Sequence, residues 1–156
     1  MEVIYEKKKG IAYITLNRPD ALNSIDPEMA VQLADTWQDF HDDKSLRCAI
    51  ITGAGDQAFC TGGDLKKMLP LVTGAKEPET EADKRFVTEK EHMEKFVLRD
   101  YEIYKPIIAA INGHVIAAGF ELLLSTDIRV ASEDALFGFQ EVKWSNGLCL
   151  QEGVVR

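Results

Sequence analysis

Two short, unbroken apolar runs constrain the fold of this chain most, at residues 48–52 and 107–111. Runs of this length, each followed by a glycine-containing turn, are typical of strands that are covered on both faces. A helical pattern lies between them, because Met29, Leu33 and Trp37 recur every four residues and define one apolar face. Strands and helices interleave along the whole chain, so the sequence predicts a layered α/β domain.

The remaining elements follow from turn and capping signals. The Pro-Glu pair after Asp26 predicts a helix over 27–41 with Asp26 as its N-cap. We expect 1–156 to form a single domain with a mobile segment at about 72–82, where glycine, proline and acidic residues gather. The other expected elements are a hairpin of 3–5 with 11–16, a short helix over 64–69 stopped by Pro70, a long helix over 83–104, a helix from about Gly119, and strands at 128–131 and 136–139.

The composition of the chain disfavours nucleic acids and membranes as binding partners. The chain carries 18 Lys and Arg against 26 Asp and Glu, a formal net charge of −8, which opposes binding to nucleic acid and to anionic membranes. Its longest apolar stretch, 107–111, is far too short to cross a bilayer. Residues 1–6 contain two glutamates and resemble no secretory signal, so we expect a cytoplasmic protein. The alternative is an organelle whose transit peptide has been removed.

The three cysteines indicate neither a metal site nor a disulfide framework. Cys48, Cys60 and Cys149 form no CxxC motif and have no histidine at metal-ligand spacing. We therefore expect reduced thiols and no bound metal. Cys60 has no basic neighbour to stabilise a thiolate, which favours a packing role over a nucleophilic one.

A glycine-rich segment raises the possibility of nucleotide binding. Residues 53–58 match the GxGxxA form of the dinucleotide fingerprint directly after a predicted strand. That motif requires a helix to begin at the glycines, so that its N-terminus meets the pyrophosphate. Here residues 59–63, which end in two glycines, interrupt any such helix. The pattern therefore disfavours a nucleotide site.

Two strand-to-helix turns are candidates for binding an oxyanion. Residues 62–64 (Gly-Gly-Asp) and 117–119 (Ala-Ala-Gly) each follow an apolar strand and open a helix. Backbone N–H groups at a helix start have no partner within the helix. Two such turns brought together would aim two donors at one developing negative charge, which requires small residues because the ligand must approach the main chain. The alternative is that both are ordinary tight turns.

Two glutamates with apolar neighbours are candidate acid and base groups. Glu121 lies two residues into the helix expected from Gly119, and Glu141 follows the strand expected at 136–139. Two carboxyl groups in one apolar environment are pushed apart in pKa, which suits one as acid and the other as base. The alternatives are a first-turn glutamate favoured by the helix dipole for Glu121 and an exposed loop residue for Glu141.

These motifs together resemble the enoyl-CoA hydratase/isomerase (crotonase) family. The resemblance is carried by Ile-Thr-Leu-Asn-Arg-Pro at 14–19, Ala-Ile-Ile-Thr-Gly at 49–53 with Phe-Cys-Thr-Gly-Gly-Asp-Leu at 59–65, the stretch 105–127, and 135–144. It implies an α/β fold built as a spiral of ββα units. It also implies an acyl-coenzyme A substrate and no separate cofactor, since coenzyme A is part of the substrate.

The resemblance also implies roles for particular residues. The two oxyanion donors fall on the N–H groups of Gly63 and Ala118, and the acid/base pair falls on Glu121 and Glu141. The substrate-binding positions are Gly63, Asp64, Leu65 and Ala118. Because both glutamates are present, the resemblance favours hydration of an enoyl-CoA, or the reverse reaction.

The chain departs from the family pattern in three places. Residues 117–119 read Ala-Ala-Gly where the family usually has three glycines, and residues 146–156 differ from the Pro- and Gly-rich turn that typically follows Trp144 in the family. The sequence also stops at Arg156. Family members continue into helices that complete the acyl pocket and build homo-oligomers. We therefore expect a truncated catalytic core without its assembly helices. The alternative function is a non-catalytic remnant that binds acyl-CoA or a partner protein.

Overall fold

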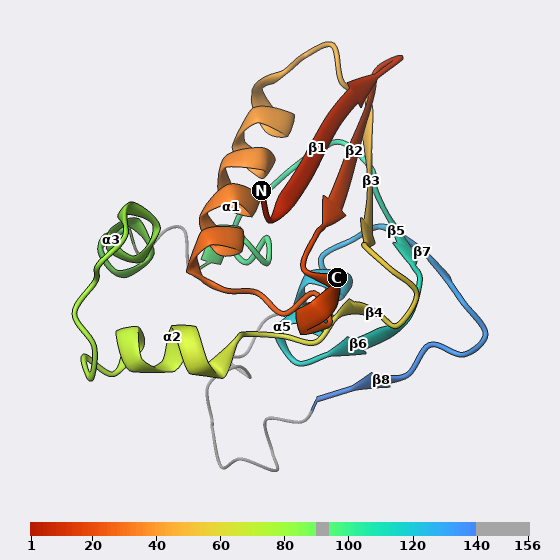
Figure 1. Ribbon diagram of the computed structural model, residues 1–156. Coiled ribbons are helices and arrows are strands. Elements are labelled where there is room, and N and C mark those ends of the chain that lie inside the picture. Colours follow the sequence, from red (N-terminus) through yellow and green to blue (C-terminus); the bar gives the residue numbers. More distant parts are fainter. Residues whose placement is uncertain (90–93, 140–156) are drawn as a thin grey trace.

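The computed structural model describes residues 1–89 and 94–139, which form two β-sheets with helices packed around them (Figure 1). The larger sheet has the order β1-β2-β3-β5-β7 and the smaller has the order β4-β6-β8. The strands of the larger sheet are β1 (Val3–Lys8), β2 (Ile11–Leu16), β3 (Cys48–Gly53), β5 (Ile107–Ile111) and β7 (Ile128–Ala131). The smaller sheet contains β4 (Ala58–Cys60), β6 (His114–Ile116) and β8 (Phe137–Gly138). The helices are η1 (Pro19–Ala21), α1 (Pro27–Asp42), α2 (Leu65–Val72), α3 (Glu81–Thr88) and α5 (Ala118–Leu124).

The chain winds as a spiral in which each turn adds one strand to each sheet. β3 is followed by β4, β5 by β6 and β7 by β8, and helices separate the successive pairs. Apart from the antiparallel β1–β2 hairpin, every pairing is parallel. Parallel neighbours need such a crossover between them. The described residues therefore confirm the α/β class and the ββα spiral.

Helix α1 covers one side of the larger sheet (Figure 1). The apolar face predicted from the sequence is its buried face, and Met29, Leu33 and Trp37 have no exposed surface. Asp26 caps the helix by accepting a hydrogen bond from the N–H of Met29 at 2.9 Å, as expected. The indole N–H of Trp37 donates to the carbonyl of Phe96, which ties the helix to the segment before β5.

The two apolar runs form the central strands, as predicted, but their faces are covered unequally. In β3, Ala49 and Ile51 are fully buried, whereas the residues that alternate with them are half-buried. β5 shows the same alternation. An unbroken apolar run does not reveal this difference, because it lacks the polar residues that would mark the less covered face.

The short helix predicted to stop before Pro70 extends through it, so that expectation is wrong. α2 runs to Val72 and contains Pro70. Proline removes one backbone donor from a helix, but the last turn is held because both the N–H and the hydroxyl of Thr73 donate to the carbonyl of Leu69. The segment expected to be mobile, 72–82, overlaps the ends of α2 and α3, and its mobility stays a prediction.

The single long helix predicted over 83–104 is also wrong. α3 begins at Glu81 with a capping box between Thr80 and Asp83, and it ends at Thr88. Further along, Leu98 and Asp100 have φ angles of 59° and 51°, which no right-handed helix accommodates. Of the apolar residues on helical spacing, Phe86, Phe96 and Val97 are buried in one core although they belong to separate segments, whereas Tyr104 is exposed.

The smaller sheet was largely missed by the sequence analysis. β4 and β6 contain three residues each, and β8 is shorter than the strand expected at 136–139. Strands this short carry too few residues to show an alternating pattern. Their pairing is nevertheless what brings the two glycine-containing turns together.

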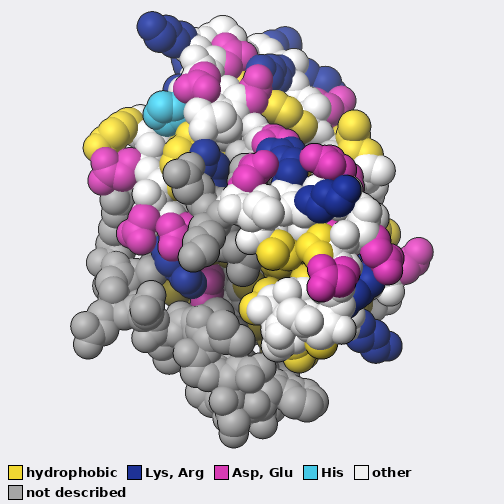
Figure 2. Space-filling view, turned by 90° about the vertical axis from the view of Figure 1, so that its left-hand side faces the viewer, with side chains coloured by type: hydrophobic (Ala, Val, Ile, Leu, Met, Phe, Trp, Pro, Cys, Tyr) yellow, Lys and Arg dark blue, Asp and Glu magenta, His cyan; other side chains and the backbone are white. Residues whose placement is uncertain are grey.

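The surface has mixed charge and some exposed apolar side chains. Figure 2, which faces α2 and α3, shows acidic and basic side chains interspersed over the upper part of this face. Leu65, Leu69 and Val72 are exposed along α2, and Ile128 and Val130 are exposed on the edge strand β7. Within the described residues, no helix combines the length and apolar character needed to traverse a membrane.

The contacts of Lys105 at the C-terminal end of α1 provide a test of the fold. The ammonium of Lys105 donates to the carbonyls of Phe40 and Asp43 at 2.7 Å each, so it satisfies terminal carbonyls of α1 and places a cation at the negative end of the helix dipole. We expect Lys105→Met to lower the free energy of unfolding by about 1–3 kcal/mol. Urea denaturation measures this, with Lys44→Met at an exposed position as the control; equal effects of the two substitutions would contradict the capping role.

Candidate active site

The two strand-to-helix turns predicted as oxyanion donors lie against each other. β4 pairs with β6 in parallel, with Cys60 opposite Val115, so the turns that follow these strands are neighbours. A Cβ atom placed on Gly62 would lie 2.6 Å from the Cβ of Ala117 and 3.3 Å from the backbone nitrogen of Ala118. The site therefore brings together residues that are far apart in the sequence.

The backbone of both turns has the special conformation that such close contact requires. Gly62 has φ of 90°, a region that L side chains rarely adopt. Ala117, the N-cap of α5, has φ of 56° and ψ of −128°, a conformation that costs on the order of 1–3 kcal/mol for a residue other than glycine. Backbone strain of this kind is frequent at functional sites. It places the first residue of α5, Ala118, beside the other turn.

Gly119 allows the helix to approach the neighbouring strand. A Cβ atom at this position would lie 2.4 Å from the carbonyl oxygen of Cys60, a separation that van der Waals repulsion forbids. The first turn of α5 therefore packs directly on the end of β4. Glycine is required at 119, whereas alanine is accommodated at 117 and 118.

The backbone donors in the two turns can be accounted for. The N–H of Asp64 donates to the carbonyl of Ile25, and the N–H groups of Phe120 and Glu121 donate to the carbonyl of Ala117. Within residues 1–89 and 94–139, we find no hydrogen bond from the N–H of Gly63 or of Ala118. Both residues are half-buried rather than enclosed. These two donors are therefore available to a ligand.

Glu121 lies in the first turn of α5, three residues after Ala118. Its side chain is buried, and its Oε2 pairs with the guanidinium of Arg99 at 2.8 Å. Its Oε1 is buried without a hydrogen-bond partner among the described residues. A buried acceptor without a partner is costly, so this oxygen is a candidate acceptor for a hydrogen bond from a ligand.

Arg99 was not predicted from the sequence. The residues next to Glu121 in the sequence are apolar, whereas the folded chain adds a cation beside it. A buried carboxylate generally requires such a partner, so the need for one was predictable. Its identity was not, because the long helix predicted over 83–104 gave a wrong path for the segment that carries Arg99.

The other predicted residues occupy different environments. The carboxylate of Asp64 caps α2 through the N–H of Lys67 and pairs with Arg18 at 3.0 Å. Leu65 begins α2 and is about half exposed. Glu141 lies outside the described residues, so its convergence with Glu121 stays a prediction.

Three other kinds of site were considered from the sequence: a dinucleotide site, a metal site and a reactive cysteine. Residues 54–57 form bends that lead into strand β4 and not into a helix, so the geometry needed for dinucleotide binding is absent from this described segment. The part of the chain that the structure covers contains no cluster of three or more His, Cys, Asp or Glu residues able to hold a metal. Cys60 is fully buried, and this burial raises the pKa of its thiol to about 12.

Comparison with known proteins decides the family. The family model for enoyl-CoA hydratase/isomerase matches residues 6–151. This chain belongs to the enoyl-CoA hydratase/isomerase family. The match includes both turns and both predicted glutamates.

Relatives of the chain carry related names. It is 40% identical over 150 residues to (E)-benzylidenesuccinyl-CoA hydratase of Thauera aromatica, covering 92% of this chain and 52% of that protein. It is 42% identical over 135 residues to a probable peroxisomal enoyl-CoA hydratase 1 of Arabidopsis thaliana, covering 86% of this chain and 45% of that protein. The chain thus spans about half the length of these curated relatives.

Solved structures agree with the fold. An enoyl-CoA hydratase/isomerase from Xanthobacter autotrophicus Py2 superposes with a TM-score of 0.74 at 33% identity, covering 92% of this chain and 51% of that one. One from Mycobacterium paratuberculosis gives a TM-score of 0.74 at 32% identity, covering 91% and 53%. The described architecture is that of the family, over about half of these structures' length.

The close approach at Gly119 is testable by substitution. We expect Gly119→Ala to lower the free energy of unfolding by about 2 kcal/mol or more, because the added methyl meets a backbone carbonyl that cannot move freely. Gly138→Ala is the control, since among residues 1–89 and 94–139 a Cβ there would meet only Ile116 Cδ1, at 3.8 Å. Denaturant unfolding of the two variants compares them, and similar stabilities would contradict the packing described.

The burial of Cys60 predicts its reactivity. Thiolates are the reactive form, so the raised pKa keeps this thiol protonated and inert at neutral and mildly alkaline pH. We expect iodoacetamide at about pH 8 to modify Cys48, which is half-buried, faster than Cys60. Peptide mass mapping resolves the two sites. Rapid labelling of Cys60 in the folded chain would contradict its burial, whereas labelling only after denaturation agrees with it.

Proposed function

We propose that this chain carries the catalytic core of an enoyl-CoA hydratase, which adds water across the double bond of an α,β-unsaturated acyl-CoA thioester. The observation that carries the proposal is the contact of two turns whose N–H groups, at Gly63 and Ala118, are not used within the described structure. Membership of the enoyl-CoA hydratase/isomerase family supports it. The reaction needs no separate cofactor, because coenzyme A belongs to the substrate.

The oxyanion donors act on the thioester carbonyl. Addition of water to the β-carbon moves negative charge onto the carbonyl oxygen, giving an enolate. Two fixed N–H donors stabilise this charge more than they stabilise the neutral carbonyl, and therefore lower the barrier. The half-exposed positions of Gly63 and Ala118 leave room for the thioester to reach them.

In this proposal, the two glutamates transfer the protons. Glu121 accepts a proton from water as the oxygen bonds to the β-carbon, and Glu141 delivers a proton to the α-carbon, which completes the addition. The pair between Arg99 and Oε2 leaves Oε1 of Glu121 as the oxygen that meets the water. We further propose that Asp64 and Leu65 contact the substrate, as the family resemblance implies.

Hydration of crotonyl-CoA by the purified chain tests the proposal. Loss of the conjugated enoyl absorbance should depend on the protein and saturate with substrate. Binding of the thioester without turnover would favour the alternative, a non-catalytic acyl-CoA-binding protein. Binding to NAD in preference to free coenzyme A would contradict both.

Substitution of the acid/base pair provides a sharper prediction. We expect Glu121→Gln and Glu141→Gln each to lower kcat by about a hundredfold or more with little change in coenzyme A affinity, because the amide keeps the shape but cannot exchange the proton. Glu133→Gln, at an exposed turn, is the matched control and should retain activity. Turnover like that of the unmodified chain in either glutamine variant would remove that residue from the mechanism.

Gly63→Pro deletes one oxyanion donor, and losing such a donor costs on the order of 3 kcal/mol of transition-state stabilisation.

A further inference from the structure

Arg18 lies among three carboxylates next to the proposed oxyanion site. Its Nε is 2.7 Å from Glu2 Oε2, and its Nη2 is 3.0 Å from Asp64 Oδ2 and 3.4 Å from Asp26 Oδ2. The side chain is only 12% exposed. A guanidinium can reach several acceptors at once because its donors lie in a rigid planar fork.

The same guanidinium also binds the backbone beside the Gly63 turn. Its Nη1 donates to the carbonyl of Ser24 at 2.5 Å. The next residue, Ile25, forms a parallel bridge with Gly63, in which its N–H donates to the Gly62 carbonyl and its carbonyl accepts from the Asp64 N–H, both at 2.7 Å. Arg18 therefore holds both sides of this bridge, through Ser24 and through Asp64.

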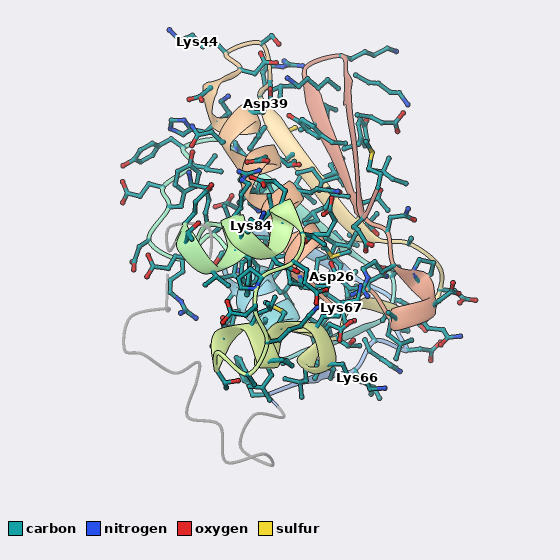
Figure 3. The ribbon with its side chains drawn as sticks, turned by 60° about the vertical axis from the view of Figure 1, so that its left-hand side comes forward. Asp26, Asp39, Lys44, Lys66, Lys67 and Lys84 are labelled. Atoms are coloured by element: carbon teal, nitrogen blue, oxygen red, sulfur yellow. The ribbon has the colours of Figure 1, made fainter. Side chains whose placement is uncertain are left out.

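The ammonium group of Lys67 is a second cation in this cluster. Lys67, on α2, pairs with Asp26 at 2.6 Å, and Figure 3 shows these two side chains next to each other between α1 and α2. Asp26 is almost fully buried and also caps α1. The Lys67 ammonium pairs with Asp26, whereas the Asp64 carboxylate accepts from the Lys67 backbone N–H and pairs with the Arg18 guanidinium. The ionic link from the cluster to the Gly63 turn therefore runs through Arg18.

We propose that Arg18 is a positioning residue for the oxyanion donor: by clamping Ser24 and Asp64 it fixes the Gly63 N–H toward the thioester oxygen. This inference rests on the proposed function for the identity of the ligand. The clamp itself is a property of the folded chain and can be measured without a ligand. Lysine at 18 would keep the charge but lose the fork, so it should reach one carboxylate and release the others.

The first test measures the clamp directly by amide hydrogen exchange in the full chain. In Arg18→Lys and Arg18→Gln, we expect the Asp64 and Ile25 amides to exchange at least about tenfold faster, while the Ile51 amide of buried strand β3 changes little. Arg85→Lys is the matched control, because Arg85 forms a two-pronged pair with Asp35 that joins α3 to α1. Equal changes in the exchange rates of the Asp64 and Ile51 amides, or no change at Asp64, would overturn the proposal. If Arg18→Gln does not fold, the exchange rates in Arg18→Lys decide the outcome.

The second test asks whether the clamp serves the oxyanion site. Acetoacetyl-CoA forms an enolate with a near-ultraviolet absorbance band, which grows when the thioester oxygen is stabilised. We expect Arg18→Lys to weaken the bound enolate signal about tenfold while leaving the affinity for S-ethyl-CoA, which lacks the carbonyl, within about twofold. Parallel losses for both ligands would overturn the positioning role. Absence of any acetoacetyl-CoA signal in the unmodified chain would instead refute the proposed function, with the exchange test still deciding the clamp.

Discussion

The candidate site depends on one constraint, the direct backbone contact between the ends of two parallel strands. β4 and β6 place Gly62 against Ala117, and Gly119 against the carbonyl of Cys60, at separations that leave no space for larger side chains. Hydrogen bonding of the short strands sets this distance. The contact brings the available N–H groups of Gly63 and Ala118 into neighbouring turns. Ala118 begins α5, where a backbone donor has no partner within the helix, and Gly63 lies just before Asp64, the N-cap of α2.

Charged side chains stabilise the segments that surround this contact. Arg18 connects the β2 end to the Gly63 turn, and Arg99 connects the segment before β5 to Glu121. Each arginine lies on a stretch without regular secondary structure or at a strand end, where backbone ladders provide little restraint. Partly buried guanidinium–carboxylate pairs are directional and specific in geometry, so they supply the positional precision that short strands and turns lack.

The sequence was informative where an element is long enough to show a pattern. Helix α1 and strands β2, β3 and β5 were predicted to within one residue at their ends. The helix follows from the helical period of its apolar residues, and the strands follow from short apolar runs bounded by turn signals. The helix predicted over 83–104 failed for the opposite reason. Its apolar residues fit helical spacing, but Leu98 and Asp100 have left-handed φ angles, and buried segments of different conformation produce the same apolar content.

By itself, the sequence determined the α/β class, the central strands and the residue types needed at the two turns, because these depend on local periodicity and on the absence of side-chain bulk. It also contained motifs that resemble the enoyl-CoA hydratase/isomerase family. Only the tertiary structure decided that Gly62 touches Ala117, that Arg99 pairs with Glu121, and that Arg18 reaches Asp64. These contacts join residues separated by 22 to 55 positions along the chain. No local pattern encodes which distant partner a side chain meets.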